Sequence, residues 1–147
     1  MAQLFGRQWS RAELLAHVGD LSQLAGVRLG EWSEGTERGV RTADVRTGSG
    51  FEFTVLLDRG MDIGPALYRG LPLGWISPAG FSHPAYYDPV GLGWLRTFGG
   101  GLLTGCGLTY LGAPGVDEGE ALGLHGRLSH LPARHVRVGE DWQGDEC

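Results

Sequence analysis

The sequence predicts an all-β protein, an antiparallel β-sandwich with one short helix near the N-terminus. Three observations support this fold class. Glycine occurs 27 times among 147 residues without a period, and seven prolines accompany it, as expected for many turns between short strands. Residues 51–57 begin with an alternation of apolar and polar side chains, the period of a half-buried strand. Beyond residue 19, no segment shows a convincing helical period.

The composition is that of one ordinary globular domain. The length allows a real hydrophobic core, and we expect one domain over residues 1–147, without linker or repeat. Hydrophobic residues make up 41% and charged residues 20%, which argues against a disordered chain. The net charge of −5 argues against nucleic acid or an anionic membrane as a partner, because both require a basic surface.

Membrane and secretion signals are missing from the sequence. No apolar run approaches the about 20 residues of a membrane span, and the first ten residues lack the pattern of a signal peptide. Two cysteines, Cys106 and Cys147, are too few for a disulfide framework. We therefore expect a reducing, cytoplasmic location.

A helix is predicted to begin after Ser10. Ser10 and Glu13 match a capping box, in which each side chain accepts a hydrogen bond from the other residue's backbone N–H. Leu14, Leu15 and Val18 then give a short apolar face, and Gly19 is predicted to end the helix.

The clearest predicted strand covers residues 51–57. The turn TGSG before it indicates a hairpin whose other strand covers residues 39–47. Glu52, Thr54 and Leu56 share one face of this strand, and Glu52 and Thr54 are predicted to point outward or into a groove. The opposite face is predicted to point toward the core: Phe51, Phe53, Val55 and Leu57.

Three further strand regions are expected. Residues 64–78 indicate a second hairpin around the sequence RGLP, and residues 99–112 a buried strand interrupted by glycines. Residues 132–142 begin another strand pattern that has no successor, so we expect at least one sheet edge without a partner.

Charged residues follow the strand at 51–57, in the sequence LLDRGMDIG. In one interpretation Arg59 and Asp62, with Asp58, bind the hydroxyl groups of a sugar. In the other, an Asp–Arg pair and a turn stabilise a corner of the fold. Arg96 precedes three glycines, which would let a ligand approach the backbone, although a bulge with an exposed arginine explains the same pattern.

Aromatic residues surround the segment SPAGFSHPAYYDPVGLGW. They form either the floor of a sugar site, because one face of a sugar ring is apolar, or a small core beneath a long loop. The residues are Trp75, Phe81, Tyr86, Tyr87 and Trp94.

The stretch GLHGRLSH holds the strongest candidate for catalysis, His125. Gly123 and Gly126 lie on either side of His125 and permit close approach of a ligand, and Arg127 could bind hydroxyl groups. His125, His130 and His135 are spaced by five, which suits metal binding on neither a strand nor a helix. We therefore expect no metal site and a structural role for His130.

Four motifs in order, LLDRGMDIG, PLGWISPAG, WLRTFGGGLLTGCGL and LGLHGRLSHLPA, resemble the aldose 1-epimerase (galactose mutarotase) superfamily, in its uncharacterised branch. The resemblance implies an antiparallel β-sandwich that binds a sugar in a groove on one sheet. It assigns an active-site histidine to His125 and a substrate-contacting arginine to Arg96. Members of the superfamily are much longer, so we expect this chain to correspond to their N-terminal part.

The expected activity is the interconversion of sugar anomers, with His125 as an acid or base. Arg96, Arg127, Arg59, Asp62 and Trp75 are the predicted substrate-binding residues, and no cofactor is expected. The resemblance places the remaining acid and base on later strands, so a non-catalytic sugar-binding module, or a truncated inactive fragment, stays open as an alternative. A metal-dependent, cupin-like sugar isomerase is a third. The expected partners are a small sugar and a second copy of the chain, paired through an open sheet edge.

Overall fold

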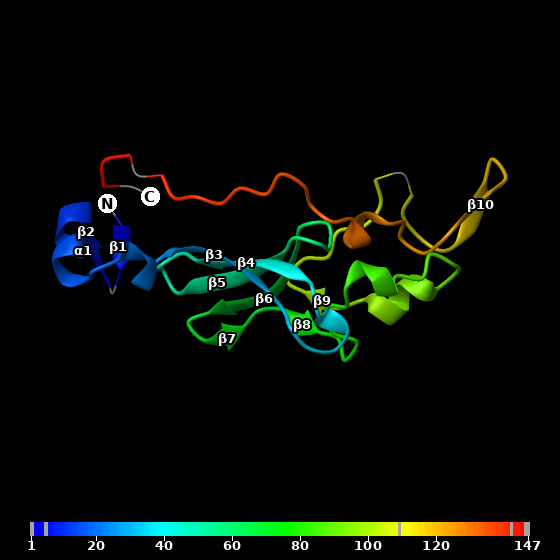
Figure 1. The fold of residues 1–147 in the computed structure, drawn as a ribbon, viewed down its shortest axis with the longest axis horizontal. Helices are drawn as coiled ribbons and strands as arrows, with labels where there is room; N and C mark the ends of the chain where they lie inside the picture. Colours follow the sequence, from blue (N-terminus) through cyan, green and yellow to red (C-terminus); the bar gives the residue numbers. More distant parts are fainter. Residues whose placement is uncertain (1, 5, 109, 142, 146–147) are drawn as a thin grey trace.

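The computed structural model describes residues 2–4, 6–108, 110–141 and 143–145. At its centre lies a five-stranded antiparallel sheet in the order β3-β4-β5-β6-β7 (Figure 1). Its strands are β3 (Gly26–Glu31), β4 (Arg41–Arg46), β5 (Phe51–Leu56), β6 (Asp62–Tyr68) and β7 (Leu71–Pro72).

Three two-stranded antiparallel sheets accompany the central sheet. They are β1 (Ala2–Leu4) with β2 (Arg7–Trp9), β8 (Trp75–Ile76) with β9 (Gly100–Gly101), and β10 (Gly115–Asp117) with β11 (Glu120–Leu122). The described chain is therefore mostly β with antiparallel pairing, which confirms the predicted fold class and is consistent with part of a sandwich.

Helical structure is short. The α-helix of the described chain is α1 (Arg11–His17), and the 3-10 turns are η1 (Leu21–Gln23), η2 (Gly35–Glu37), η3 (Pro84–Tyr86), η4 (Gly93–Thr97) and η5 (Leu128–His130). Across the described ranges, no helix has the length and apolar character needed to cross a membrane.

The capping box at the start of α1 is confirmed. The Glu13 N–H donates to the Ser10 hydroxyl at 3.2 Å, and the Ser10 N–H donates to the Glu13 carboxylate at 2.8 Å. The helix ends at His17, with Val18 rather than Gly19 as its cap. Leu14 is buried but Leu15 is exposed, so the apolar face is narrower than predicted.

The hairpin of β4 and β5 is confirmed, and β6 and β7 form the second predicted hairpin, turning at Arg69 and Gly70. Leu56, on the same face as Glu52 and Thr54, is fully buried, and its neighbour Leu57 is buried as well. The end of β5 is therefore covered on both faces, while Glu52, near its start, is exposed as predicted.

Two predicted strands are wrong within the described residues. Of residues 99–112, Gly100 and Gly101 pair with β8, and Leu103 makes one bridge to Ile63. Glycines in the left-handed region, with φ values of 73° and 99° at positions 100 and 101, interrupt the extended backbone. Residues 132–141 form no strand and run back along the molecule as irregular chain (Figure 1).

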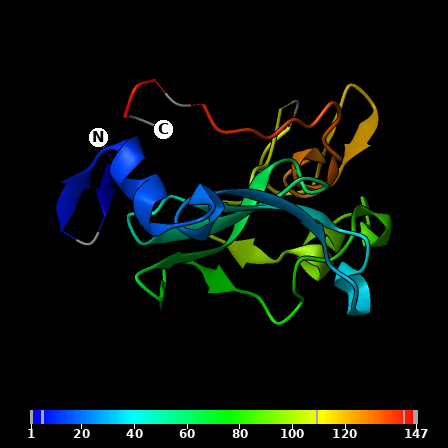
Figure 2. The same ribbon diagram turned by 60° about the vertical axis from the view of Figure 1, so that its left-hand side comes forward.

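The hairpin of β10 and β11 was not predicted. Its turn contains Glu118 and Gly119, both with positive φ, and its side chains are mostly exposed, so no apolar alternation marks it. At the other end of the molecule, residues 2–4 and 143–145 lie near each other in both views (Figures 1 and 2). There the Arg11 N–H donates to the Asp145 carboxylate at 2.9 Å.

Candidate functional site

His125 lies in a hollow beside the β8–β9 sheet, which we call the His125 hollow. Its volume is about 350 Å³. The residues that line the hollow are mainly aromatic residues and glycines, with few polar groups. Its lining residues are Trp75, Trp94, Phe98, Gly100, Gly101, Thr104, Cys106 and His125.

The aromatic rings of the hollow contact one another in series. Trp94 is stacked on Phe98 with ring centroids 4.9 Å apart, and Phe98 lies 6.1 Å from Trp75. Trp94 and the imidazole of His125 form a T-shaped pair, with ring centroids 4.9 Å apart and an angle of 76° between the planes. Trp94 is buried and Trp75 is exposed, so the rings lead from the core to the surface. Such rings offer apolar faces to a ligand.

The backbone of His125 is held in the left-handed region, with φ of 56°, which is unusual for a residue other than glycine. Two hydrogen bonds fix it: the His125 N–H donates to Gly112 O at 3.0 Å, and the Gly107 N–H donates to His125 O at 2.9 Å. Nδ1 of the imidazole is buried without a hydrogen-bond partner.

The glycines of the hollow are required by close backbone contacts. A Cβ at Gly100 would collide with the carbonyl oxygen of Trp75, and one at Gly101 would lie 2.5 Å from Ile63 O. Any side chain here would push β8 and β6 away from the segment that carries Thr104 and Cys106. The glycine run thus brings that segment close to His125.

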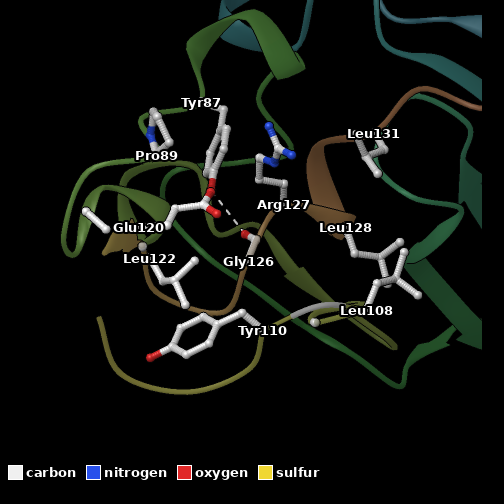
Figure 3. A pocket seen from close by; sticks show the side chains of 13 residues that line it. Tyr87, Pro89, Leu108, Tyr110, Glu120, Leu122, Gly126, Arg127, Leu128 and Leu131 are labelled. Atoms are coloured by element: carbon white, nitrogen blue, oxygen red, sulfur yellow. Dashed lines mark hydrogen bonds between the residues drawn. The ribbon is translucent and has the colours of Figure 1, made fainter. Parts of the chain in front are cut away.

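A second space, the Arg127 cleft, is lined by Gly126 and Arg127, the two residues that follow His125 in the chain (Figure 3). Two segments, residues 106–108 and 125–127, form a partition between the hollow and the cleft. Cys106 and His125 line the hollow, and the residues that follow them line the cleft: Gly107, Leu108, Gly126 and Arg127. The cleft has a volume of about 290 Å³. Its lining residues are Tyr87, Pro89, Gly107, Leu108, Tyr110, Glu120, Ala121, Leu122, Gly123, Gly126, Arg127, Leu128 and Leu131.

Arg59 and Asp62 are buried beneath the surface, with exposed fractions of 1% and 2%. The Arg59 guanidinium donates to Ser82 O at 2.6 Å and to Thr97 O at 2.8 Å, so it joins two loops. The Asp62 carboxylate accepts from the Gly105 N–H at 2.6 Å. Neither side chain lines the hollow or the cleft, and their burial favours the structural interpretation of this corner.

The environment of Asp62 changes its protonation. Burial raises the pKa of its carboxyl group to about 6, against the opposing effects of the Gly105 N–H and the Arg59 charge. Asp62 accepts a hydrogen bond from Gly105, which lies in the sequence between the hollow residues Thr104 and Cys106, so a group that titrates near pH 6 is bonded to this segment.

His130 has the structural role that the sequence predicts. Its imidazole contacts the Thr97 hydroxyl at 2.7 Å and the Ser129 hydroxyl at 3.1 Å, and the Trp94 indole N–H donates to Ser129 at 2.9 Å. Burial, and then the Arg59 charge, lower the pKa of His130 to about 3, so it is neutral near pH 7. This network supports the buried end of the aromatic series.

Comparison with known families gives a match over most of the chain. Residues 37–147 match the family "Domain of unknown function (DUF4432)". The chain belongs to the DUF4432 family. No curated protein matches this sequence.

The DUF4432 chain also matches a solved structure. It is similar to the crystal structure of a "putative aldose 1-epimerase" from Klebsiella pneumoniae subsp. pneumoniae, with a TM-score of 0.65 and 26% sequence identity. The similarity covers 72% of this chain and 28% of that one, so this chain spans less than a third of its neighbour's length. The match confirms the resemblance that the four motifs indicate.

The predicted site residues of this DUF4432 protein lie in different places in the structure. His125 and Trp75 share the hollow, while Arg127 lines the cleft. Arg96 is exposed on η4 and donates to the Asp88 carboxylate at 2.6 Å. It lines neither space, so the structure does not bring Arg96 to His125 as expected.

Sequence reasoning missed several residues of the DUF4432 site. Phe98, Thr104 and Cys106 line the hollow, and Tyr110 and Glu120 line the cleft. The glycines around Thr104 and Cys106 were a usable signal, because they show that this segment packs closely. In the part of the chain that the structure describes, no three His, Cys, Asp or Glu side chains are arranged to hold a metal ion.

Proposed function

We propose that this chain binds a sugar in the His125 hollow and takes part in aldose 1-epimerase chemistry, with His125 exchanging a proton with the sugar. The observation that supports this most is the position of His125. Its imidazole is held by an uncommon backbone conformation at the edge of Trp94, in a hollow lined with aromatic rings. The similarity to the Klebsiella structure supports the same class of chemistry.

The chemistry of the hollow suits a sugar ring. A hexose presents an apolar C–H face and a rim of hydroxyl groups. The rings of Trp75 and Phe98 can cover that face, while Thr104 and the backbone of Gly100 and Gly101 can bind hydroxyl groups. Trp75 thus keeps its proposed role in substrate binding.

Anomer exchange requires two proton transfers. A base removes the proton of the anomeric hydroxyl while an acid protonates the ring oxygen, the ring opens to the aldehyde, and the reverse transfers close it after rotation. The number of protons is unchanged overall. Imidazole exchanges protons near neutral pH, and in this proposal the imidazole of His125 carries out one transfer. Of the other lining residues, Cys106 is the one with a titratable side chain.

A non-catalytic sugar-binding module is the second candidate. The observation that favours it is that the hollow contains a single imidazole and no carboxylate to complete an acid–base pair. This candidate predicts sugar binding at Trp75 and Trp94 without faster anomer exchange. A cupin-like metal isomerase is the third, and elemental analysis for zinc or iron distinguishes it.

The test measures binding and exchange with the same protein. Adding D-galactose or D-glucose should shift the NMR signals of the His125 and Trp75 side chains, and exchange between the anomers should exceed the spontaneous rate. His125→Asn, which tolerates the left-handed backbone, should abolish the enhancement. His135→Asn is the matched control, because exposed His135 has nearly the same φ of 55° and lines neither space.

Each result has a definite meaning. Enhancement lost only in His125→Asn supports the epimerase. Binding without enhancement supports the non-catalytic module. If neither sugar shifts signals of the hollow, or if enhancement survives in His125→Asn, the proposed role of His125 is wrong.

A further inference from the structure

The Arg127 cleft has a chemistry different from that of the His125 hollow, and the two share no lining residue. We propose that the cleft is a separate binding site for an α-amino acid with a large apolar side chain. This proposal does not depend on the sugar chemistry of the hollow. It rests on three features of the cleft: its charges, its apolar wall and its fixed tyrosine.

Two opposite charges line one part of the cleft. Glu120 is supplied by β11, and Arg127 precedes η5, so they come from separate elements. Figure 3 shows both side chains reaching into the space near the Tyr87 ring. Within the described residues, neither charge has an ion-pair partner. An ammonium group can therefore pair with Glu120, and a carboxylate with the two parallel N–H donors of Arg127.

Leucines line the remaining part. Leu108, Leu122 and Leu128 lie below Glu120 and Arg127 in Figure 3. Leu108 is highly exposed and has φ of 78°, so a strained backbone holds an apolar side chain at the rim. A volume of about 290 Å³ suits one small molecule. An apolar side chain on the ligand would cover these leucines.

The ring of Tyr87 is fixed before a ligand binds. It is stacked on the buried His130 at 4.1 Å, and its hydroxyl donates to Gly126 O at 3.0 Å. Burial raises the pKa of its hydroxyl, which stays protonated. A preformed wall reduces the entropy lost on binding.

Other ligand classes fit the cleft less well. A simple anion would pair with Arg127 but be repelled by Glu120. A neutral sugar could hydrogen-bond Glu120 and Arg127 through its hydroxyl groups, but it would leave both charges without a counterion. A ligand that carries both charges next to an apolar group satisfies all three features, and an α-amino acid with a large apolar side chain, such as leucine, is a molecule of this kind.

The test is an NMR titration of the whole chain with L-leucine, L-leucinamide and N-acetyl-L-leucine. The amide lacks the carboxylate and the acetyl derivative lacks the ammonium group. We expect leucine to shift the backbone signals of Glu120, Gly126 and Arg127, with a Kd on the order of 1 mM, and both derivatives to bind at least about tenfold more weakly.

Two substitutions test the charges of Arg127 and Glu120 separately. Arg127→Gln and Glu120→Gln should each weaken leucine binding by about tenfold or more. Both side chains are exposed, so the folds should persist, as judged by unchanged signals elsewhere. Glu118→Gln, in the adjoining turn and outside the cleft, is the matched control and should bind leucine like the unchanged chain.

Four results would overturn the proposal. They are an absence of leucine-induced shifts in the cleft, equal binding of leucine and its two derivatives, undiminished binding by Arg127→Gln, and shifts in the cleft caused by galactose but not by leucine. The last would assign the cleft to the sugar site.

Discussion

The ring of Tyr87 is stacked on the imidazole of His130, with centroids 4.1 Å apart and planes inclined by 17°. Tyr87 lines the cleft, and the hydroxyl groups bonded to His130 lead to Trp94 at the hollow. A single buried imidazole therefore supports both spaces.

Replacing His130 should destabilise the protein. His130→Asn removes the stacking on Tyr87 and leaves Thr97 or Ser129 without its partner, so we expect a loss of about 2–4 kcal/mol in the free energy of unfolding, measured with urea. His135→Asn, at an exposed position, should change it by less than about 0.5 kcal/mol. Equal effects of the two substitutions would contradict the structural role of His130.

The effect of His130→Asn should depend on pH in a defined direction. The pKa of His130 is about 3 in the folded chain and near 6.5 in the unfolded chain. The stability that the neutral imidazole contributes is therefore complete above pH 6.5 and is lost as the pH falls toward 3. The difference between the unchanged chain and the variant should shrink over that range, and a constant difference would contradict the assignment.

The free energy of unfolding should depend on the protonation of Asp62 in the opposite direction from that of His130. Its pKa is about 6 when folded and near 3.8 when unfolded, so the buried charge destabilises the fold above pH 6 and this cost disappears as the pH falls to 4. Asp62→Asn, whose side-chain oxygen can still accept from the Gly105 N–H, should be more stable than the unchanged chain at pH 7.5, by up to roughly 3 kcal/mol.

The control for Asp62→Asn is the same comparison at pH 4.5, where Asp62 is protonated and the advantage should be small. Asp58 also titrates, but it is present in both proteins, so it does not change the stability difference between them. Thermal unfolding followed by circular dichroism at the two pH values measures the difference. An Asn variant that is less stable at both values would show that the carboxylate charge stabilises the fold.

Glycine at position 101 should be necessary for the shape of the hollow. Gly101→Ala places a Cβ 2.5 Å from Ile63 O, in addition to the strain of a φ of 99°. Gly70→Ala carries similar strain, with φ of 80°, but meets no atom within 4 Å. We expect a loss of about 1 kcal/mol for Gly70→Ala and at least about 2 kcal/mol more for Gly101→Ala, measured with urea. Similar losses would show that the backbone moves apart easily at Gly101.

We propose that the chain associates with itself through β3. Among the described strands, β3 pairs with β4 alone, so its outer edge is open. Leu29, on this edge, is 50% exposed and continues an apolar row across the sheet through Ala43, Val55 and Ile63. The average mass in sedimentation should therefore rise with protein concentration.

Leu29→Lys should reduce this association. Leu15→Lys is the matched control, because Leu15 is similarly exposed, at 45%, but lies on α1. A chain that stays monomeric up to about millimolar concentration, or equal effects of the two substitutions, would exclude β3 as the contact.

The sequence predicted those elements of the fold that are stabilised by residues close together in the chain. The capping box of Ser10 and Glu13 forms because both partners lie within one turn, and the β4–β5 hairpin follows from a short turn and an apolar alternation. The β10–β11 hairpin was missed because exposed strands have no core-facing pattern. Residues 132–141 have the alternation of a strand but no neighbouring strand with which to pair.

The sequence predicted only the part of the site that is formed by residues close together in the chain. His125 and its flanking glycines formed a recognisable local pattern, but the hollow also depends on contacts between residues far apart in the sequence, such as Trp75 with Gly101. Arg59 resembled a ligand-binding residue because sequence does not reveal that Ser82 and Thr97 supply carbonyl oxygens to its guanidinium. Arg96 pairs with Asp88 and does not line the hollow.

The partition between the hollow and the cleft gives the two spaces a thermodynamic relationship. The hydrogen bond from Gly107 N–H to His125 O joins its two segments, so a shift of one segment is transmitted to the other. If a ligand in the cleft displaces this partition, it changes the affinity of the hollow for its own ligand. Linkage then requires the hollow's ligand to change the affinity of the cleft by the same factor. Two neighbouring sites with one common wall would thus communicate in both directions with equal strength.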